Sequence, residues 1–412
     1  MFKRVFKAFE YRDFRLMWFG ACTSSIGTWM QILAQSWLVY QLSNSPLYLG
    51  IDQFLGQIPI FLLSLFGGVF ADRKSRRGIL LASQFIQMSC AFILTALVAT
   101  HVVQVWHIWC LSFTVGIAQA FGGPAYQALV PSLVGKEDLQ NAIALNSIQF
   151  NLARVIGPML GGLALAKLGA AWCFALNGLS FVAVVISLIA IQVTFTPSRK
   201  GESVIDSMRE GFAFVRKREG MVSLIVLAFL MTALAFPMIS FLPVFAKDVF
   251  HGGPDTYMWF LVASGAGSVA GALIVAGSKK SANSFRRALS TIVVLGLFIT
   301  GFGLSYSRLL SIGLLFGGGA SMMIVFALNS TLVQAYVGDA MRGRVMSVYN
   351  VAFRGGMPMG SLLSGYLIKS MSAPLVMRAN GILMGLLGLS FLLVHRSPPA
   401  EDRVPVAREA SN

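Results

Sequence analysis

Charged side chains are scarce in this chain of 412 residues. Asp, Glu, Lys and Arg make up 12% of it, about half of the ~25% that is usual in soluble domains. Apolar residues reach 56% and the mean hydropathy is +0.73, which excludes a soluble enzyme and a disordered chain. Cysteine is also rare, with four residues and no CxxC pair, which excludes a disulfide scaffold. Of the classes of protein considered, the composition fits an integral membrane protein.

Long apolar stretches occupy most of the chain. A helix that crosses the hydrocarbon core needs about 20 mostly apolar residues. Twelve stretches reach this length: 14–41, 46–71, 79–100, 105–130, 139–166, 172–193, 222–246, 256–277, 288–305, 309–333, 341–368 and 374–395. Their uniform apolarity favours helices over the short alternating strands of a membrane barrel. The predicted fold class is therefore an all-α membrane protein with twelve transmembrane helices.

Basic residues are unevenly distributed between the predicted loops. If the N-terminus is cytoplasmic, the loops on the outer side carry only Lys167, Lys247, Arg308 and Lys369. Because basic loops are retained in the cytoplasm, we expect a multi-pass protein of the inner membrane with both termini cytoplasmic. This topology accounts for the net charge of +16 without any binding of nucleic acid.

The same map divides the chain into five segments. They are an amphipathic cytoplasmic segment (1–13), a six-helix bundle (14–193), a cytoplasmic linker (194–221), a second six-helix bundle (222–395) and a polar tail expected to be disordered (396–412). Within the linker, apolar residues at helical spacing predict a surface helix from Asp206 to Lys217.

A faint internal repeat relates the two halves. A shift of 203 residues places Gly157 on Gly360 and Gly162 on Gly365. Such symmetry is typical of transporters that are built from two repeated bundles. The two predicted bundles are therefore expected to be pseudo-symmetric.

The loop after the second stretch, residues 68–77, reads GVFADRKSRR. It resembles the loop 2–3 signature of the major facilitator superfamily, G-x-x-x-D-R-x-G-R-R, with Ser75 in place of a glycine. An acid followed by a basic run can change partners when two bundles rock; the alternative is a plain topology anchor. The candidate switch residues are Gly68, Asp72, Arg73, Arg76 and Arg77. The resemblance implies that Asp72 lies near Met341 and Arg342, where the dipole of a helix N-terminus favours an acid.

Residues 153–162, ARVIGPMLGG, resemble the antiporter motif of the same superfamily, whose core is G-P-x-x-G-G. Small residues let helices approach closely and Pro158 bends the span, so ordinary helix packing is the alternative explanation. The candidate motif residues are Arg154, Gly157, Pro158, Gly161 and Gly162. The motif implies an exporter.

Further segments narrow the resemblance. They are GTWMQ (27–31), AQSWL (34–38), LVP (129–131) and LQNA (139–142). Together they are similar to the branch that includes the enterobactin exporter and macrolide efflux pumps, of the drug:proton antiporter type. The resemblance covers most of the chain, is strongest over residues 10–165, and implies a major facilitator fold. We expect a monomer.

Charged residues within the predicted spans are candidates for transport chemistry, because a charge in hydrocarbon is costly. Asp52 is the sole acid there and is the proton-coupling candidate; the alternative is an acid in a wet outer vestibule. Arg154 and Arg354 lie near mid-span, at a depth that differs from that of Asp52 by around 10 Å. They either hold an anionic group or bond to helix ends.

Neutral polar residues are expected to line the path. Thr28, Gln31 and Gln35 share one helical face. The further path candidates are Gln57, Gln119, Tyr126, Asn146, Asn151, Asn329, Asn350 and Arg354. The 32 Phe and 19 Met residues suit a pocket that accepts varied apolar shapes.

The predicted function is secondary active export of a small amphiphilic compound, siderophore-like or drug-like, by alternating access with proton antiport. A lipid or lysolipid flippase, a metal-ion exporter of the same fold and a non-transporting receptor remain alternatives. No phosphate loop, HExxH motif or Ser/His/Asp set occurs, so we expect no enzyme activity, cofactor or resident metal. The expected partners are the substrate, protons and the lipid bilayer.

Overall fold

A computed structural model describes residues 6–192, 204–218, 220–278, 284–335 and 337–394. The described residues form helices, turns and connecting segments, without a strand. The predicted tail (396–412) and most of the N-terminal half of the linker lie outside these residues. The predicted linker helix is present as α8 (Val204–Lys217).

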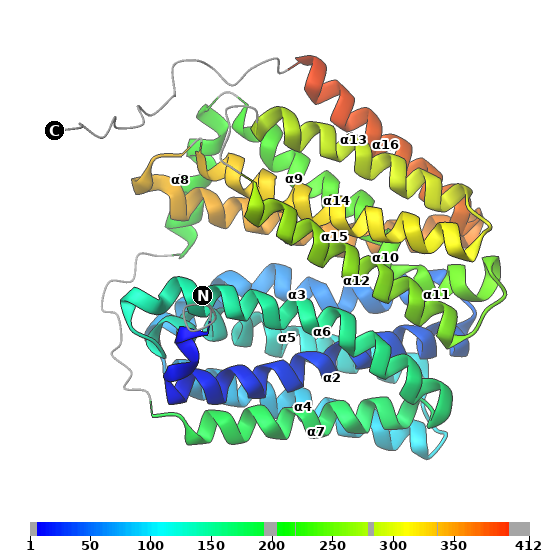
Figure 1. The fold of residues 1–412 in the computed structure, drawn as a ribbon, viewed down its shortest axis with the longest axis horizontal. Coiled ribbons are helices and arrows are strands. Elements are labelled where there is room, and N and C mark those ends of the chain that lie inside the picture. The colour runs from blue at the N-terminus through cyan, green and yellow to red at the C-terminus, as the bar shows by residue number, and fades with distance from the viewer. Residues whose placement is uncertain (1–5, 193–203, 219, 279–283, 336, 395–412) are drawn as a thin grey trace.

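The helices form two layers, one above the other in Figure 1. The first bundle contains α2 (Arg12–Ser43), α3 (Pro46–Arg73), α4 (Arg76–Ala99), α5 (Val105–Leu129), α6 (Leu139–Lys167) and α7 (Ala170–Ala190), with short turns η1 (Lys7–Glu10), η2 (Val130–Ser132) and η3 (Lys136–Asp138). The second contains α9 (Met221–Ala235), α10 (Pro237–Ser240), α11 (Leu242–Val244), η4 (Phe245–Val249), α12 (Pro254–Gly277), α13 (Ser284–Leu304), α14 (Arg308–Ala335), α15 (Asp339–Ser370) and α16 (Ala373–Val394). The prediction of an all-helical protein with two bundles is confirmed.

Ten helical segments of the described residues are long and apolar enough to cross a membrane. Helices α2 and α15 are 32 residues long each but are not among the ten. Both carry polar residues such as Gln31, Gln35 and Arg354, which lower their hydropathy. They nevertheless run beside the other helices, because α2 packs on α6 and α7 while α15 packs on α3 and α9. The count of twelve spans stays a prediction.

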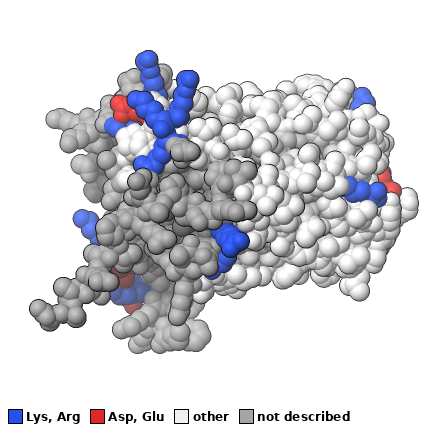
Figure 2. Space-filling model, turned by 90° about the horizontal axis from the view of Figure 1, so that it is seen from above, with Lys and Arg blue, Asp and Glu red and all other residues white. Residues whose placement is uncertain are grey.

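The two ends of the molecule differ in charge. Figure 2 shows Lys and Arg gathered at one end, an uncharged band along the body, and a few charged residues at the other end. We call the first the basic end; there α2 begins at Arg12 and α3 ends at Arg73. At the opposite end, called the far end, α2 ends at Ser43 and α3 begins at Pro46. An uncharged surface between two charged ends is what a bilayer requires.

Glycines at equivalent positions allow equivalent close contacts inside each bundle. Gly157 on α6 lies against Trp29 on α2, and a Cβ atom at Gly157 would collide with it. Gly360 on α15 lies in the same way against the backbone of Ala233 on α9. The 203-residue repeat therefore corresponds to the same helix crossing in each bundle, because only glycine permits such an approach.

A second pair of equivalent glycines lies between the bundles. Gly162 on α6 faces Met258 on α12, and Gly365 on α15 faces Pro46 and Gly50 on α3. These two helix pairs, α6 with α12 and α3 with α15, are the main contacts between the bundles. The antiporter-like motif thus has two packing roles, one within its own bundle and one across the divide.

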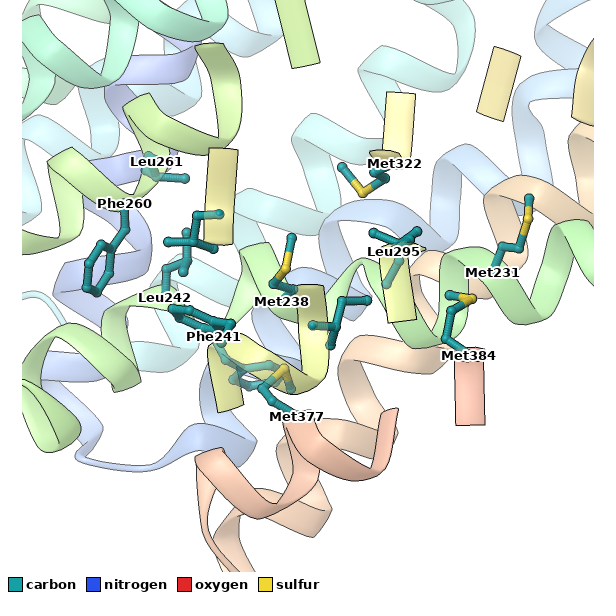
Figure 3. Packing of buried hydrophobic residues seen from close by; sticks show 14 of the residues in the cluster. Met231, Met238, Phe241, Leu242, Phe260, Leu261, Leu295, Met322, Met377 and Met384 are labelled. Atoms are coloured by element: carbon teal, nitrogen blue, oxygen red, sulfur yellow. The ribbon is translucent and has the colours of Figure 1, made fainter. Parts of the chain in front are cut away.

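Methionine and aromatic side chains fill the core of the second bundle. Figure 3 shows Met238, Phe241, Leu295 and Met322 among them, all at most 3% exposed. The seventh long segment is interrupted in this bundle, because Pro237 and Pro243, six residues further on, each lack a backbone donor. The chain continues there as short helices and then as the π-helical turn η4, which brings its polar residues to the far end.

Candidate transport site

A cavity of about 600 Å³ lies between the two bundles, and we call it the central cavity. Its wall from the first bundle supplies most of the polar lining groups, among them Thr28, Gln31, Gln35, Asp52, Gln57, Gln119 and Arg154, beside apolar residues such as Ile60 and Phe181. Its wall from the second bundle is mainly apolar: Phe236, Ile239, Leu261, Met322, Phe326 and Met357. The cavity therefore offers hydrogen bonds on one side and an adaptable apolar surface on the other, which suits an amphiphile.

A smaller cavity of about 390 Å³ adjoins the first, and we call it the inner cavity. Both cavities share Thr28 and Trp29 as lining residues. The inner cavity is lined further by residues close to the basic end of their helices, such as Met17 on α2 and Leu80 on α4. It thus extends the central cavity toward the basic end.

Asp52 is buried within the first bundle and held by two neighbouring helices. Its side chain is 2% exposed. Ser112 on α5 donates its hydroxyl to Oδ1 at 2.6 Å, and the amide of Gln35 on α2 donates to Oδ2 at 2.9 Å. Because both carboxylate oxygens accept a hydrogen bond, the charged form is solvated by the protein at this depth.

A chain of side-chain hydrogen bonds leads from this carboxylate along the polar wall. Gln31 donates to the amide oxygen of Gln35 at 3.3 Å, and Asn177 on α7 donates to Gln31 at 2.6 Å. A parallel link runs from Gln119 on α5 to Gln87 on α4 at 2.9 Å. The first chain joins α2, α3, α5 and α7, and the separate Gln119–Gln87 bond joins α5 to α4.

The polar lining continues into the inner cavity. Tyr126 donates its hydroxyl to Asn146, and Gln149 donates to Ser25 at 2.7 Å. Tyr126, Asn146 and Gln149 all line the inner cavity. Polar side chains thus follow the path from Asp52 toward the basic end.

The two predicted arginines lie at the cavities. Arg154 lines the central cavity, and its guanidinium lies over the Trp29 ring at 5.4 Å from the centroid. Arg354 lines the inner cavity and is exposed there. Gly265 on α12 packs against the backbone of Arg154, so Arg154 sits at the contact between bundles.

Three predicted path residues lie away from both cavities. Asn151 is bonded to the carbonyl of Ser147 on its own helix at 2.8 Å, and Asn350 is exposed. Asn329 is 2% exposed and lies among packed helices. None of the three lines either cavity. Conversely, the central cavity is lined by Ser112, Asn177 and Gln87, for which the sequence offered no spacing signal.

Two arginines of the loop 2–3 motif bond to helix ends within the first bundle. Arg76 donates to the carbonyl of Ala128 near the end of α5 at 2.8 Å. Arg77 donates to the carbonyls of Leu188 at 2.5 Å and Ile189 at 2.9 Å, near the end of α7. Cations are favoured at these helix C-termini, so both arginines tie α4 to its neighbours.

The structure gives fewer contacts for the other residues of the loop 2–3 motif. Gly68 has no neighbour within 4 Å of an added Cβ atom. Arg73 is exposed. The Asp72 side chain lies outside the described residues, so its predicted approach to Met341 and Arg342 stays a prediction.

The far end holds a contact between bundles that sequence analysis did not identify. Tyr40 on α2 donates its hydroxyl to Asp248 on η4. Lys247 donates to Asn44 at 2.6 Å and lies 5.4 Å from the centroid of the Tyr40 ring. We call these four residues the far-end clasp. Its only signal in the sequence is an acid beside a base at the end of an apolar stretch.

Two bundles of membrane-length helices around a central cavity define a class of protein, the membrane transporters of the major facilitator fold. Solved structures show the same fold. A mutant of the peptide transporter POT superposes with a TM-score of 0.74 at 12% identity, over 93% of this chain and 94% of that one. The nucleoside transporter NupG gives 0.71 at 13% identity, over 92% and 98%.

Within this class, the family model of transmembrane secretion effectors matches residues 4–410, and the chain belongs to that family. It is similar to the multidrug efflux pump Tap of Mycolicibacterium fortuitum, with 25% identity over 92% of this chain and 95% of the relative. It is similar to the enterobactin exporter EntS of Escherichia coli O1:K1, with 26% over 86% and 85%. It is also similar to macrolide efflux protein A of Streptococcus pyogenes, with 24% over 86% and 90%. The predicted family is confirmed, and the chain is a transmembrane efflux transporter.

Proposed function

We propose that this protein exports a small amphiphilic organic compound from the cytoplasm across the inner membrane, in exchange for protons. The observation that carries the proposal is the two-sided central cavity, polar on one wall and apolar on the other, with a buried carboxylate in the polar wall. Its volume of about 600 Å³ is in the range of sites for small organic ligands. Export from the cytoplasm accords with the drug and siderophore exporters among its relatives.

The basic end is the cytoplasmic end in this proposal. The gathering of Lys and Arg there supports it, because basic segments are retained in the cytoplasm. The far-end clasp joins the bundles at the opposite end, and the inner cavity extends toward the basic end. We therefore assign this conformation to the inward-facing half of the cycle, in which substrate enters from the cytoplasm.

Asp52 is the proton carrier in this mechanism. Its carboxylate accepts hydrogen bonds from Ser112 on α5 and Gln35 on α2. When the bundles rock, these donors stay with Asp52 because they belong to its own bundle. The water access of Asp52 changes, which alters its preference for a proton. Proton uptake on the outer side and release on the inner side then drive the return of the empty carrier. The loop 2–3 motif, with Asp72, would act as the switch at the basic end.

The test is to profile small molecules inside and outside cells that express the protein, Asp52→Asn or Asp255→Asn. Asp255 is an exposed acid at the far end of α12 and serves as the matched control. We expect a compound enriched in the medium with the unchanged protein and the control, and not with Asp52→Asn. Enrichment inside the cells would reverse the direction. Export that persists with Asp52→Asn under a proton gradient would contradict the role of Asp52, and an unchanged profile would favour a receptor.

A further inference from the structure

The two intramembrane arginines lie on corresponding helices of the two bundles, α6 and α15. Arg154 and Arg354 each lie 15 residues beyond the first residues of their helices, Leu139 and Asp339. Both helices begin at the basic end, so each arginine lies about 22 Å along its helix from that end. One cationic group from each bundle therefore faces the transport path, Arg154 at the central cavity and Arg354 at the inner cavity.

Neither arginine has an anionic partner among the described residues. Arg154 has only its contact with the Trp29 ring, and Arg354 has neither an ion pair nor a hydrogen bond to another described residue. Asp52 is the one acid that lines either cavity in the described part of the chain. Both of its oxygens already accept bonds from Ser112 and Gln35. The path thus carries an excess of positive charge, which is costly at membrane depth unless an anion is supplied.

We propose that the substrate is an organic anion, a carboxylate or similar oxyanion on an apolar body, whose charge is bound by Arg154 and Arg354. The guanidinium group suits this chemistry, because its planar donors match the two oxygens of a carboxylate. An anion that enters from the basic end reaches the inner cavity, with Arg354, before the central cavity, with Arg154. There the apolar body rests on the wall formed by residues such as Met322 and Phe326. The same arginines repel cationic compounds.

This inference rests on the proposed function, because it concerns the ligand of the same cavities. The full-length protein in lipid nanodiscs is titrated with three fluorescent probes that share one ring and linker: pyrenebutanoate, pyrenebutanamide and pyrenebutylamine. Empty nanodiscs correct for partition into lipid. We expect the carboxylate to bind at least about tenfold more tightly than the amide, the ratio for one charge-assisted contact, and the amine to bind most weakly.

The arginine variants identify the residues responsible. Arg154→Gln and Arg354→Gln should each reduce the carboxylate-to-amide ratio severalfold, and the double variant should abolish it. Lys167→Gln and Lys369→Gln are matched controls, since each removes an exposed cation from the far end of the same two helices. Both controls should keep the ratio. The affinity of each variant for the amide probe reports whether the cavity is intact. Where a glutamine variant fails to fold, the Arg→Lys variant at the same position replaces it, and it should retain part of the preference for the carboxylate.

Three outcomes overturn the inference. They are no preference of the unchanged protein for the carboxylate, a preference for the amine, and a carboxylate preference that survives the double Arg154 and Arg354 substitution. The test of the proposed function is independent of these outcomes. If the arginine-dependent preference holds while export is independent of Asp52, the anion site stands and proton antiport does not. If Asp52-dependent export concerns a neutral or cationic compound, export stands and the anion site does not.

Discussion

The far-end clasp gives the sharpest quantitative prediction of the conformational cycle. Tyr40→Phe removes the hydroxyl that bonds to Asp248 and keeps the ring beside Lys247. Tyr40 is 3% exposed, whereas Asp248 is exposed. A hydrogen bond to a charged acceptor contributes ~1.5–3 kcal/mol, and exposure moves the value to the lower end. We therefore expect a loss of ~1.5 kcal/mol, which is about a tenfold increase in the population open at the far end.

The assay measures access to the central cavity from the far side. Ser36 lies in the lining of that cavity and is one helical turn from Tyr40. A Ser36→Cys substitution, in a chain whose native cysteines are replaced, reacts with a membrane-impermeant thiol reagent only while the far end is open. Tyr40→Phe should raise the rate of this reaction about tenfold, in proportion to the open population.

Tyr48→Phe is the matched control for this experiment. Tyr48 is a 39% exposed tyrosine at the same end, and its hydroxyl has no hydrogen bond to another described residue. The control should leave the reaction rate unchanged. If Tyr40→Phe also leaves it unchanged, the Tyr40–Asp248 bond does not hold the far end closed, and the assignment of the clasp as a gate is wrong.

Two further predictions concern packing and pH. Gly360→Ala forces a Cβ atom into the backbone of α9 and should lower the free energy of unfolding by ~1–3 kcal/mol, measured as a lower thermal midpoint in detergent. Gly385→Ala is the control, because a Cβ atom there has no neighbour within 4 Å, and it should not lower the midpoint. The hydrogen bond and charge of Asp138 raise the pKa of Lys7 above its ordinary 10.5, and a hydrogen bond to Asp138 likewise raises the pKa of Tyr11 above 10.0. Because the folded state holds both protons more tightly, the attachment of η1 is stabilised fully below about pH 10 and weakens as the pH rises further. Proteolysis of the N-terminal segment between about pH 8 and 11 should accelerate over this window, and less so in Asp138→Asn; a flat profile would contradict the assignment.

The sequence predicted those features that depend on short-range patterns. Apolar runs of membrane length indicate helices wherever they occur, because the backbone must be satisfied within lipid. The glycine pairs at a 203-residue spacing predicted pseudo-symmetry, since a close crossing needs glycine at the same point in each bundle. Asp52, Arg154 and Gln35 were found because polar groups are rare in apolar spans, and all three line the central cavity.

Only the tertiary structure decided which polar residues face the path and which partners they have. Asn151 and Asn329 are as conspicuous in their spans as Gln31, yet neither lines a cavity. The rotation of each helix about its axis is set by packing against helices that are distant in sequence. The Tyr40–Asp248 bond, for example, joins residues 208 positions apart. Helix formation is local and can be read from one segment, whereas lateral packing joins segments whose proximity no single stretch of sequence encodes.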